Sequence, residues 1–374
     1  MKFRPLITFI IAVVVLVGAW RITQRKTPTA DVQAVELYPG LIDKINDVRS
    51  ITVKNKDGAV TVARAGERWT VHSLDDYPAN VATIKQALVQ LASLKILDIK
   101  TSNAAKYAQI GVEDVTSPDA HSRLVTVIGA GPSPTALLIG KERPAKAQMA
   151  PRHYVRRAGE ANALLVEGEL SFSAKANDWL DSTVADIPVD RVHQVTVKPH
   201  DGKPFTVQKA NPQEQLYTLA EVPAGFEVRA RATVSSIGGL LLDAKFERVM
   251  AASKLAGLTP RASAVVETFD GLVGIVDAYE VDKAIYLTLK FAQQAVAAPP
   301  TTGTPKASGA EPAPANPSAL KKPAEIAIEV EELNKRVASW AYVLPDYKSH
   351  LLDKKFEDLI KKKALPAAVS GAPK

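Results

Sequence analysis

The stretch "SITVKNKDGAVTV", residues 50–62, is nearly repeated as "QVTVKPHDGKPFTV", residues 194–207. In each stretch, apolar residues alternate with polar ones, an Asp-Gly pair follows, and a second apolar run begins. Alternation with a period of two is typical of a strand with one buried face, and Asp-Gly between two such runs is typical of a tight turn. Each stretch therefore predicts a β-hairpin, and their similarity predicts an internal repeat.

The similarity extends beyond the hairpins. Residues 69–71, "WTV", are matched by residues 217–219, "YTL", and each predicts a third strand. Apolar residues at helical spacing follow in both copies: Val81, Ile84, Leu88 and Leu91 in the first, and Val234, Ile237, Leu241 and Ala244 in the second. Asp76 and Pro78 suit the cap and first turn of the first helix. Tyr154-Val155 in the first copy and Tyr342-Val343 in the second are the last matching pair.

These patterns predict an α+β fold made by tandem duplication of a β-meander-plus-helix unit, which gives two similar lobes after one N-terminal transmembrane helix. We expect an anchor and its flank at residues 1–30, a first lobe at 31–183 and a second lobe at 184–365. Within the second lobe, the Pro- and Ala-rich residues 297–323 predict a disordered loop. Residues 366–374 predict a flexible tail.

The N-terminus has the pattern of a membrane anchor. Lys2 and Arg4 precede an uncharged apolar run at residues 5–20, and three more basic residues follow it by position 26. Basic flanks and a terminal Trp20 favour a retained single-pass anchor. A removable signal peptide, cleaved near Ala19, is the alternative. A short basic N-terminus by default stays in the cytoplasm, which places the body on the periplasmic side of a bacterial inner membrane.

The charge distribution argues against nucleic acid as a partner. The formal net charge is +7, but residues 1–30 hold five cations and no anion, and residues 141–157 hold six cations and one anion. The rest of the chain is therefore slightly acidic and has no basic face. The chain has no cysteine, which excludes disulfides, thiolate catalysis and thiolate metal sites.

The residue patterns of known catalytic and metal sites are missing from the sequence. The six histidines do not stand three or four residues apart, as helical metal ligands do. Asp75 and Asp76 could form a carboxylate pair, but helix capping explains them more simply. Residues 128–134, "IGAGPSP", lack the third glycine of a dinucleotide loop. We therefore expect no catalytic residue, no metal and no cofactor, and we predict that the chain is not an enzyme.

One basic stretch is a candidate binding surface. On a strand at residues 152–157, Arg152, Tyr154 and Arg156 would share one face, and Arg157 would lie on the other. Arginines beside a tyrosine bind phosphate and carboxylate groups by paired hydrogen bonds and stacking. We predict that Arg152, Tyr154, Arg156 and Arg157 contact an anion or a partner. The alternative is a strand edge protected by its charges.

Several segments together resemble a known family. They are the anchor, the strand at Trp69 followed by "YPANVATIKQALVQLASLKI", the turn "YAQIGV", the strand "LLIGK" before "HYVRR", and the closing "WAYVLPDYKSHLLDKKFEDLI". The chain resembles the DUF4340 family, a bacterial domain of unknown function in membrane-anchored proteins that are often encoded beside ABC transporters of the gliding-motility type. The resemblance implies a single-pass envelope protein that serves a transporter as an accessory subunit.

The function expected from the sequence is therefore that of a non-catalytic, membrane-anchored envelope protein. It would act as an accessory or scaffold subunit of an ABC transporter and contact the cytoplasmic membrane through its N-terminal helix. The alternative is a binder of anionic cell-wall or lipid groups, and an envelope hydrolase or transferase is a third class.

Overall fold

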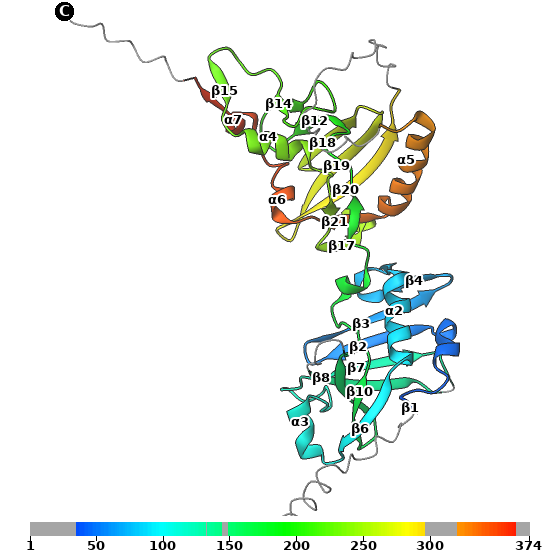
Figure 1. Ribbon diagram of the computed structural model, residues 1–374. Coiled ribbons are helices and arrows are strands. Elements are labelled where there is room, and N and C mark those ends of the chain that lie inside the picture. The colour runs from blue at the N-terminus through cyan, green and yellow to red at the C-terminus, as the bar shows by residue number, and fades with distance from the viewer. Residues whose placement is uncertain (1–34, 132, 144–148, 296–319, 364–374) are drawn as a thin grey trace, which may run out of the picture. The chain divides into compact units, whose positions relative to one another are not determined.

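The computed structural model describes residues 35–131, 133–143, 149–295 and 320–363. These residues form a mixed fold of helix and sheet in which sheet predominates, as the sequence predicts (Figure 1). They group into two compact units. Unit 1 takes its residues from Met1–Ala59 and Val81–Ala174, and unit 2 takes them from Val60–Asn80 and Lys175–Lys374.

Unit 1 is an antiparallel sheet with one main helix. Its strands follow the order β1-β6-β10-β9-β8-β7-β2. Their bounds are β1 (Val35–Glu36), β2 (Ser50–Asn55), β6 (Lys95–Thr101), β7 (Arg123–Ile128), β8 (Thr135–Arg143), β9 (Arg152–Arg157) and β10 (Ala163–Glu167). The helical segments are η1 (Ile42–Asp47), α2 (Val81–Ala92), η3 (Ala104–Lys106) and α3 (Tyr107–Ile110).

The core of unit 1 follows from two periodicities. Ile51 and Val53 on β2 are fully buried, because alternate residues of a strand face the same side of the sheet. Helix α2 buries Ile84, Leu88 and Leu91, whose spacing places them on one helical face.

Unit 2 contains a second antiparallel sheet, with the order β14-β13-β12-β18-β19-β20-β21-β17. Its strands are β12 (Val192–Lys198), β13 (Phe205–Gln208), β14 (Thr218–Leu219), β17 (Arg248–Ala251), β18 (Ala262–Thr268), β19 (Leu272–Val281), β20 (Ala284–Gln293) and β21 (Trp340–Val343). Two short ladders pair β11 (Thr183–Ala185) with β16 (Ala244–Lys245), and β15 (Phe226–Val228) with β22 (Ile360–Lys362). The segment 60–80 carries the end of β3 (Gly58–Ala65), β4 (Arg68–Val71), η2 (His72–Leu74) and β5 (Tyr77–Pro78).

Unit 2 also contains six further helical segments among its described residues, of which α4 and α5 pack on the sheet. They are η4 (Ala176–Trp179), α4 (Arg231–Gly238), η5 (Ala252–Leu255), α5 (Pro323–Val337), α6 (Asp346–Ser349) and α7 (Phe356–Leu359). Helix α5 lies against β20, where the Asn334 amide donates to the carbonyl of Phe291 and accepts from its N–H, both at 2.8 Å (Figure 1). This exchange fixes the last turns of α5 against the sheet.

The predicted hairpin strands are present. The first stretch forms β2 and β3, and the backbone N–H of Gly58 donates to the Asn55 side chain in the turn. The second forms β12 and β13, with Val195 opposite Val207.

Two local predictions were wrong, and one helix was missed. Asp76 and Pro78 do not begin a helix, because Pro78 ends β5 and α2 starts at Val81. Helix α4 stops at Gly238, so Leu241 and Ala244 are buried outside it. Helix α5 was not predicted from the sequence.

Several predictions fall outside the described residues. They are the anchor at residues 5–20, the tail at 366–374, and the loop at 297–323 as far as residue 319. Among the residues that the structure describes, no helix combines the length and the apolar character needed to cross a membrane.

Candidate functional site

The predicted basic stretch, residues 152–157, forms β9 of unit 1. In the strand order, β9 lies between β8 and β10, so both of its edges are hydrogen-bonded. It is therefore an interior strand, and the alternative of a charge-protected sheet edge is wrong.

Arg156 is buried, with 5% of its surface exposed. Its guanidinium donates to the carbonyl oxygens of Val112 (2.9 Å) and Glu160 (3.1 Å) and to a carboxylate oxygen of Asp114 (2.7 Å). It also lies over the ring of Tyr107, 4.6 Å from the centroid. These contacts tie β9 to the loop after α3, so Arg156 holds the fold of unit 1 together.

The other three predicted residues are partly buried. Arg157 donates to the Leu37 carbonyl oxygen at 2.6 Å, and Arg152 binds Glu167 on β10 at 3.3 Å. Tyr154 packs against a small core cluster that includes Tyr107. The structure thus brings these residues to one strand and gives them partners within unit 1. Their predicted contact with an anion or a partner stays a prediction.

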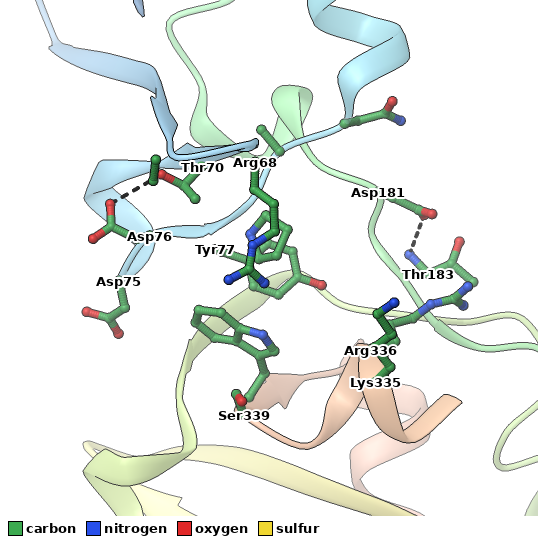
Figure 2. Close-up of a pocket in the computed structure, with 15 residues that line it drawn as sticks. Arg68, Thr70, Asp75, Asp76, Tyr77, Asp181, Thr183, Lys335, Arg336 and Ser339 are labelled. Atoms are coloured by element: carbon green, nitrogen blue, oxygen red, sulfur yellow. Dashed lines mark hydrogen bonds between the residues drawn. The ribbon is translucent and has the colours of Figure 1, made fainter. Parts of the chain in front are cut away.

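A cleft in unit 2 is a better candidate for a binding site. It has a volume of about 540 Å³, and every residue that lines it belongs to unit 2. Its walls come from β4 and β5, from the segment around β11, and from the end of α5 with the start of β21 (Figure 2). Segments far apart in the sequence therefore meet around one hollow.

Aromatic rings build the base of this cleft. The ring of Tyr77 stands edge-on to Trp340, with centroids 4.7 Å apart, and to Phe246, with centroids 5.3 Å apart. Tyr77 is buried, whereas Trp340 is only half-buried and lines the cleft. Edge-on aromatic packing fixes ring orientation, so the cleft has a rigid base with an accessible indole.

Each aspartate that lines the cleft has a partner in the protein. Asp75 accepts from the Lys254 ammonium (2.7 Å) and from the N–H of Ala251 (3.0 Å). Asp76 accepts from the Thr70 hydroxyl at 3.4 Å. Asp181 accepts from the N–H of Thr183 at 3.0 Å (Figure 2). Each of the three carboxylates therefore accepts at least one hydrogen bond from within unit 2.

The structure corrects the interpretation of Asp75 and Asp76 as helix caps. Both have a positive φ, 54° and 59°, in the tight connection between η2 and β5. Aspartate tolerates this conformation better than most residues. The hydrogen bond from Lys254 lowers the pKa of Asp75.

Three cationic side chains also line the cleft, and none of them is ion-paired within the described parts of the chain. Arg68 extends from β4, and Lys335 and Arg336 extend from the last turn of α5 (Figure 2). All three are exposed. Within the described parts of the chain, no acidic side chain lies within ion-pairing distance of any of the three.

Sequence reasoning missed this site because it missed α5. The signal was present: Pro323 at the first helical position, Glu325 two residues later, and buried Ile326, Leu333 and Val337 at helical spacing. The meeting of α5 with β4 depends on long-range packing, which no local pattern encodes.

Among the described residues, no group of three or more histidines, aspartates and glutamates could hold a metal ion.

No curated protein matches the chain. A family model does match, over residues 69–262, which is more than half of the sequence. The matched region includes β4 and β5 of the cleft, the predicted arginine strand and the second hairpin. The chain belongs to the family described as "Domain of unknown function (DUF4340)".

Proposed function

We propose that this chain is a non-catalytic, single-pass envelope protein that serves an ABC transporter as an accessory or scaffold subunit. Two observations support the anchor and the partner. Residues 5–20 form an uncharged apolar run with basic flanks. The family resemblance implies membrane-anchored proteins encoded beside such transporters, and residues 69–262 match that family.

The state of the cleft carboxylates is the observation that carries the non-catalytic part of the proposal. A carboxyl that donates a proton near neutral pH needs a raised pKa, as burial away from cations provides. The pKa of Asp75 is instead lowered by Lys254. Asp76 and Asp181 are exposed and hydrogen-bonded within the protein. The arrangement therefore argues against Asp75 as a proton donor near neutral pH, and it supports a role in binding.

We also propose that the two sheets arose by duplication. The strand order in unit 1, β2-β7-β8-β9-β10-β6, corresponds strand by strand to the order in unit 2, β12-β18-β19-β20-β21-β17. In both units a short helical turn ends near a glycine with positive φ, Gly111 after α3 and Gly257 after η5. In this alignment β21 corresponds to β10 and not to β9. The echo of Tyr154-Val155 in Tyr342-Val343 therefore compares strands that are not equivalent.

The proposal is tested by purifying the tagged full-length chain from mild detergent after crosslinking in cells. We expect transporter subunits to be recovered. A matched control chain, with residues 1–30 replaced by an unrelated single-pass anchor, should recover the same subunits if the folded units make the contact. Repeated recovery of no transporter subunit, from either chain, would contradict the partnership.

Topology and catalysis are tested separately. Protease added to spheroplasts should digest the folded units, since we place them outside the cytoplasmic membrane. A mature chain that begins after Ala19 would show that the segment is a cleaved signal peptide. Substrate turnover that is abolished by Asp75→Asn would favour an envelope hydrolase or transferase instead.

A further inference from the structure

The cleft of unit 2 has cations on two of its walls. Arg68 lies on the β4 side, and Lys335 and Arg336 lie on the α5 side (Figure 2). The position of Lys335 and Arg336 in the last helical turn is itself favourable, because cations there stabilise the negative end of the helix dipole. Arg68 has no such explanation, since it lies on a strand. The three side chains thus line one cleft, and none of them has an ion-pair partner in the described parts of the chain.

The aspartates of the cleft offset part of this positive charge, but none of them is ion-paired with Arg68, Lys335 or Arg336. Asp75 is paired with Lys254, which brings its own positive charge to the same end of the cleft. Asp76 and Asp181 keep their hydrogen bonds to Thr70 and to the Thr183 N–H. The donors that the cleft offers to a ligand are therefore two guanidinium groups and one ammonium, beside the free acceptor sites of Asp76 and Asp181.

The geometry points to a phosphate-ester binding site in this cleft, with Arg68, Lys335 and Arg336 as the residues that hold the phosphate oxygens. A phosphate monoester carries a charge of about −1.5 to −2 near neutral pH and three acceptor oxygens. A single carboxylate has two acceptor oxygens, fewer than the three cationic groups of the cleft can bind together. Guanidinium groups bind phosphate oxygens in pairs of parallel hydrogen bonds.

The half-buried indole of Trp340 gives the same cleft an apolar surface. The organic part of a phosphate ester can lie against this face while the phosphate meets the cations. Serine and threonine hydroxyls at Ser339 and Thr183 line the remaining wall. A small phosphorylated molecule therefore fits both the charge and the lining, and this inference does not depend on a transporter partner.

The test uses the full-length chain in a neutral detergent and isothermal titration calorimetry. The probes are inorganic phosphate, glucose 6-phosphate and glycerol 3-phosphate, with acetate at equal ionic strength for comparison. We expect the phosphate probes to bind at least tenfold more tightly than acetate. Tighter binding of glycerol 3-phosphate than of glucose 6-phosphate assigns the ligand to lipid headgroups, and the reverse order assigns it to phosphorylated sugars.

Variants locate the binding. Arg68→Gln and Arg336→Gln should each raise the dissociation constant about tenfold, the usual effect of losing a charge-assisted hydrogen bond. Arg68→Lys should keep part of the affinity, because the charge remains. Lys85→Gln, which removes an exposed helical cation of unit 1, is the matched control and should bind like the unaltered chain.

A second measurement places the ligand next to Trp340. Phosphate esters should change the tryptophan fluorescence of the unaltered chain and should not change that of Trp340→Phe. The inference is overturned if acetate binds as well as phosphate, or if the double change Arg68→Gln and Arg336→Gln leaves the affinity unaltered in a folded chain. Failure to recover a transporter subunit would not bear on either result.

Discussion

Arg191 joins three segments of unit 2 through buried charges. Only 4% of its side chain is exposed, and its guanidinium binds Asp270 at 2.8 Å and both carboxylate oxygens of Glu329 at 2.8 and 2.9 Å. Asp270 lies in the turn between β18 and β19, and Glu329 lies on α5. This network therefore fixes α5, and with it one wall of the cleft.

We predict that Arg191→Met lowers the free energy of unfolding of unit 2 by about 3–5 kcal/mol, because it leaves the buried carboxylate of Asp270 without its cation and leaves Glu329 with Lys321 alone. The three described tryptophans, Trp69, Trp179 and Trp340, all belong to unit 2. Urea denaturation followed by tryptophan fluorescence therefore reports on this unit. Arg229→Met, at an exposed position, is the control and should change the value by less than about 0.5 kcal/mol. Equal curves for the two variants would contradict the prediction.

The same network predicts a loss of stability in acid. Burial raises the pKa of Asp270 and Glu329, but hydrogen bonds outweigh it, chiefly those from Arg191 and also those from Thr268 and Lys321, and the pKa of both carboxyls is lowered. A lowered pKa in the folded state stabilises the fold above the pKa of the unfolded state, and this stabilisation is lost as the pH falls through the folded-state value. The free energy of unfolding of unit 2 should therefore decrease from about pH 5 downward.

Arg191→Met is also the control for this pH dependence. Without Arg191, burial should raise the pKa of Asp270, and protonation then removes its unpaired charge; Glu329 keeps its ion pair with Lys321. The difference in unfolding free energy between the unaltered chain and Arg191→Met should therefore be smaller at pH 3.5 than at pH 7. A difference that stays constant over this range would show that the network does not titrate with folding.

Arg156 leads to a prediction for unit 1. Arg156→Gln should lower its free energy of unfolding by about 2–3 kcal/mol, because the buried carbonyl oxygen of Val112 and the part-buried one of Glu160 lose their charged donor. Hydrogen exchange of the β9 and β10 amides measures this loss. Arg143→Gln, on the exposed end of neighbouring β8, should be nearly neutral. If both variants exchange alike, Arg156 does not hold β9 in place.

At the scale of single residues, the sequence predicted which side chains share a strand face, but it did not predict what packs against that face. Alternation correctly places Tyr154 and Arg156 on one face of a strand. It does not reveal that Asp114 and Val112 close over that face, because these residues come from a loop some forty positions earlier. The assumption that Arg156 is an exposed charge was wrong for this reason.

At the scale of elements, periodicity was informative where an element buries one regular face. Helix α2 begins at Val81 and ends at Ala92, close to the predicted stripe. Helix α5 was missed because its buried residues are sparse: Ile326 and Val337 lie eleven positions apart, and only Leu333 is buried between them. The flanking Pro- and Ala-rich sequence also obscured its start.

The contact between β8 and the turn after α3 is close enough to require a glycine. A Cβ atom added at Gly140 would lie 2.4 Å from the carbonyl oxygen of Ile110 and 2.8 Å from a methyl carbon of Val112. We predict that Gly140→Ala lowers the free energy of unfolding of unit 1 by about 1–3 kcal/mol through this overlap. Gly58→Ala, where a Cβ atom would meet no atom of the described chain within 4 Å, is the matched control. Proteolysis of the two variants under native conditions compares them, and equal cleavage rates would show that β8 can move away without cost.

At the scale of the whole molecule, the contacts divide the chain differently from the predicted lobes. The sequence suggests one boundary near residue 183, because the second copy of the hairpin begins soon after it. By contact, Val60–Asn80 belongs with Lys175–Lys374. Local sequence similarity cannot reveal that residues 60–80 group with unit 2, since this grouping includes the packing of Tyr77 against the rings of Phe246, Trp340 and Tyr342.

This division predicts how a fragment of unit 2 behaves. A fragment of residues 175–365 lacks Tyr77, whose ring centroid lies 4.7 Å from that of Trp340 and 6.3 Å from that of Tyr342. The fragment should therefore expose an aromatic surface, bind a hydrophobic dye, and unfold at a lower urea concentration than unit 2 does in the full chain. A peptide of residues 60–80, added in excess, binds only the folded fragment and should raise its stability by mass action.

The peptide also provides the matched controls. Tyr77→Phe keeps the ring and should restore stability nearly as well as the unaltered peptide. Tyr77→Ala removes the ring and should restore little, since truncating a buried aromatic side chain costs about 3–5 kcal/mol. Because Tyr77 and Trp340 also build the base of the cleft, the fragment should bind phosphate esters only when a peptide with an aromatic ring at position 77 is present. A fragment that is as stable alone as within the full chain would show that residues 60–80 are not part of the folded unit.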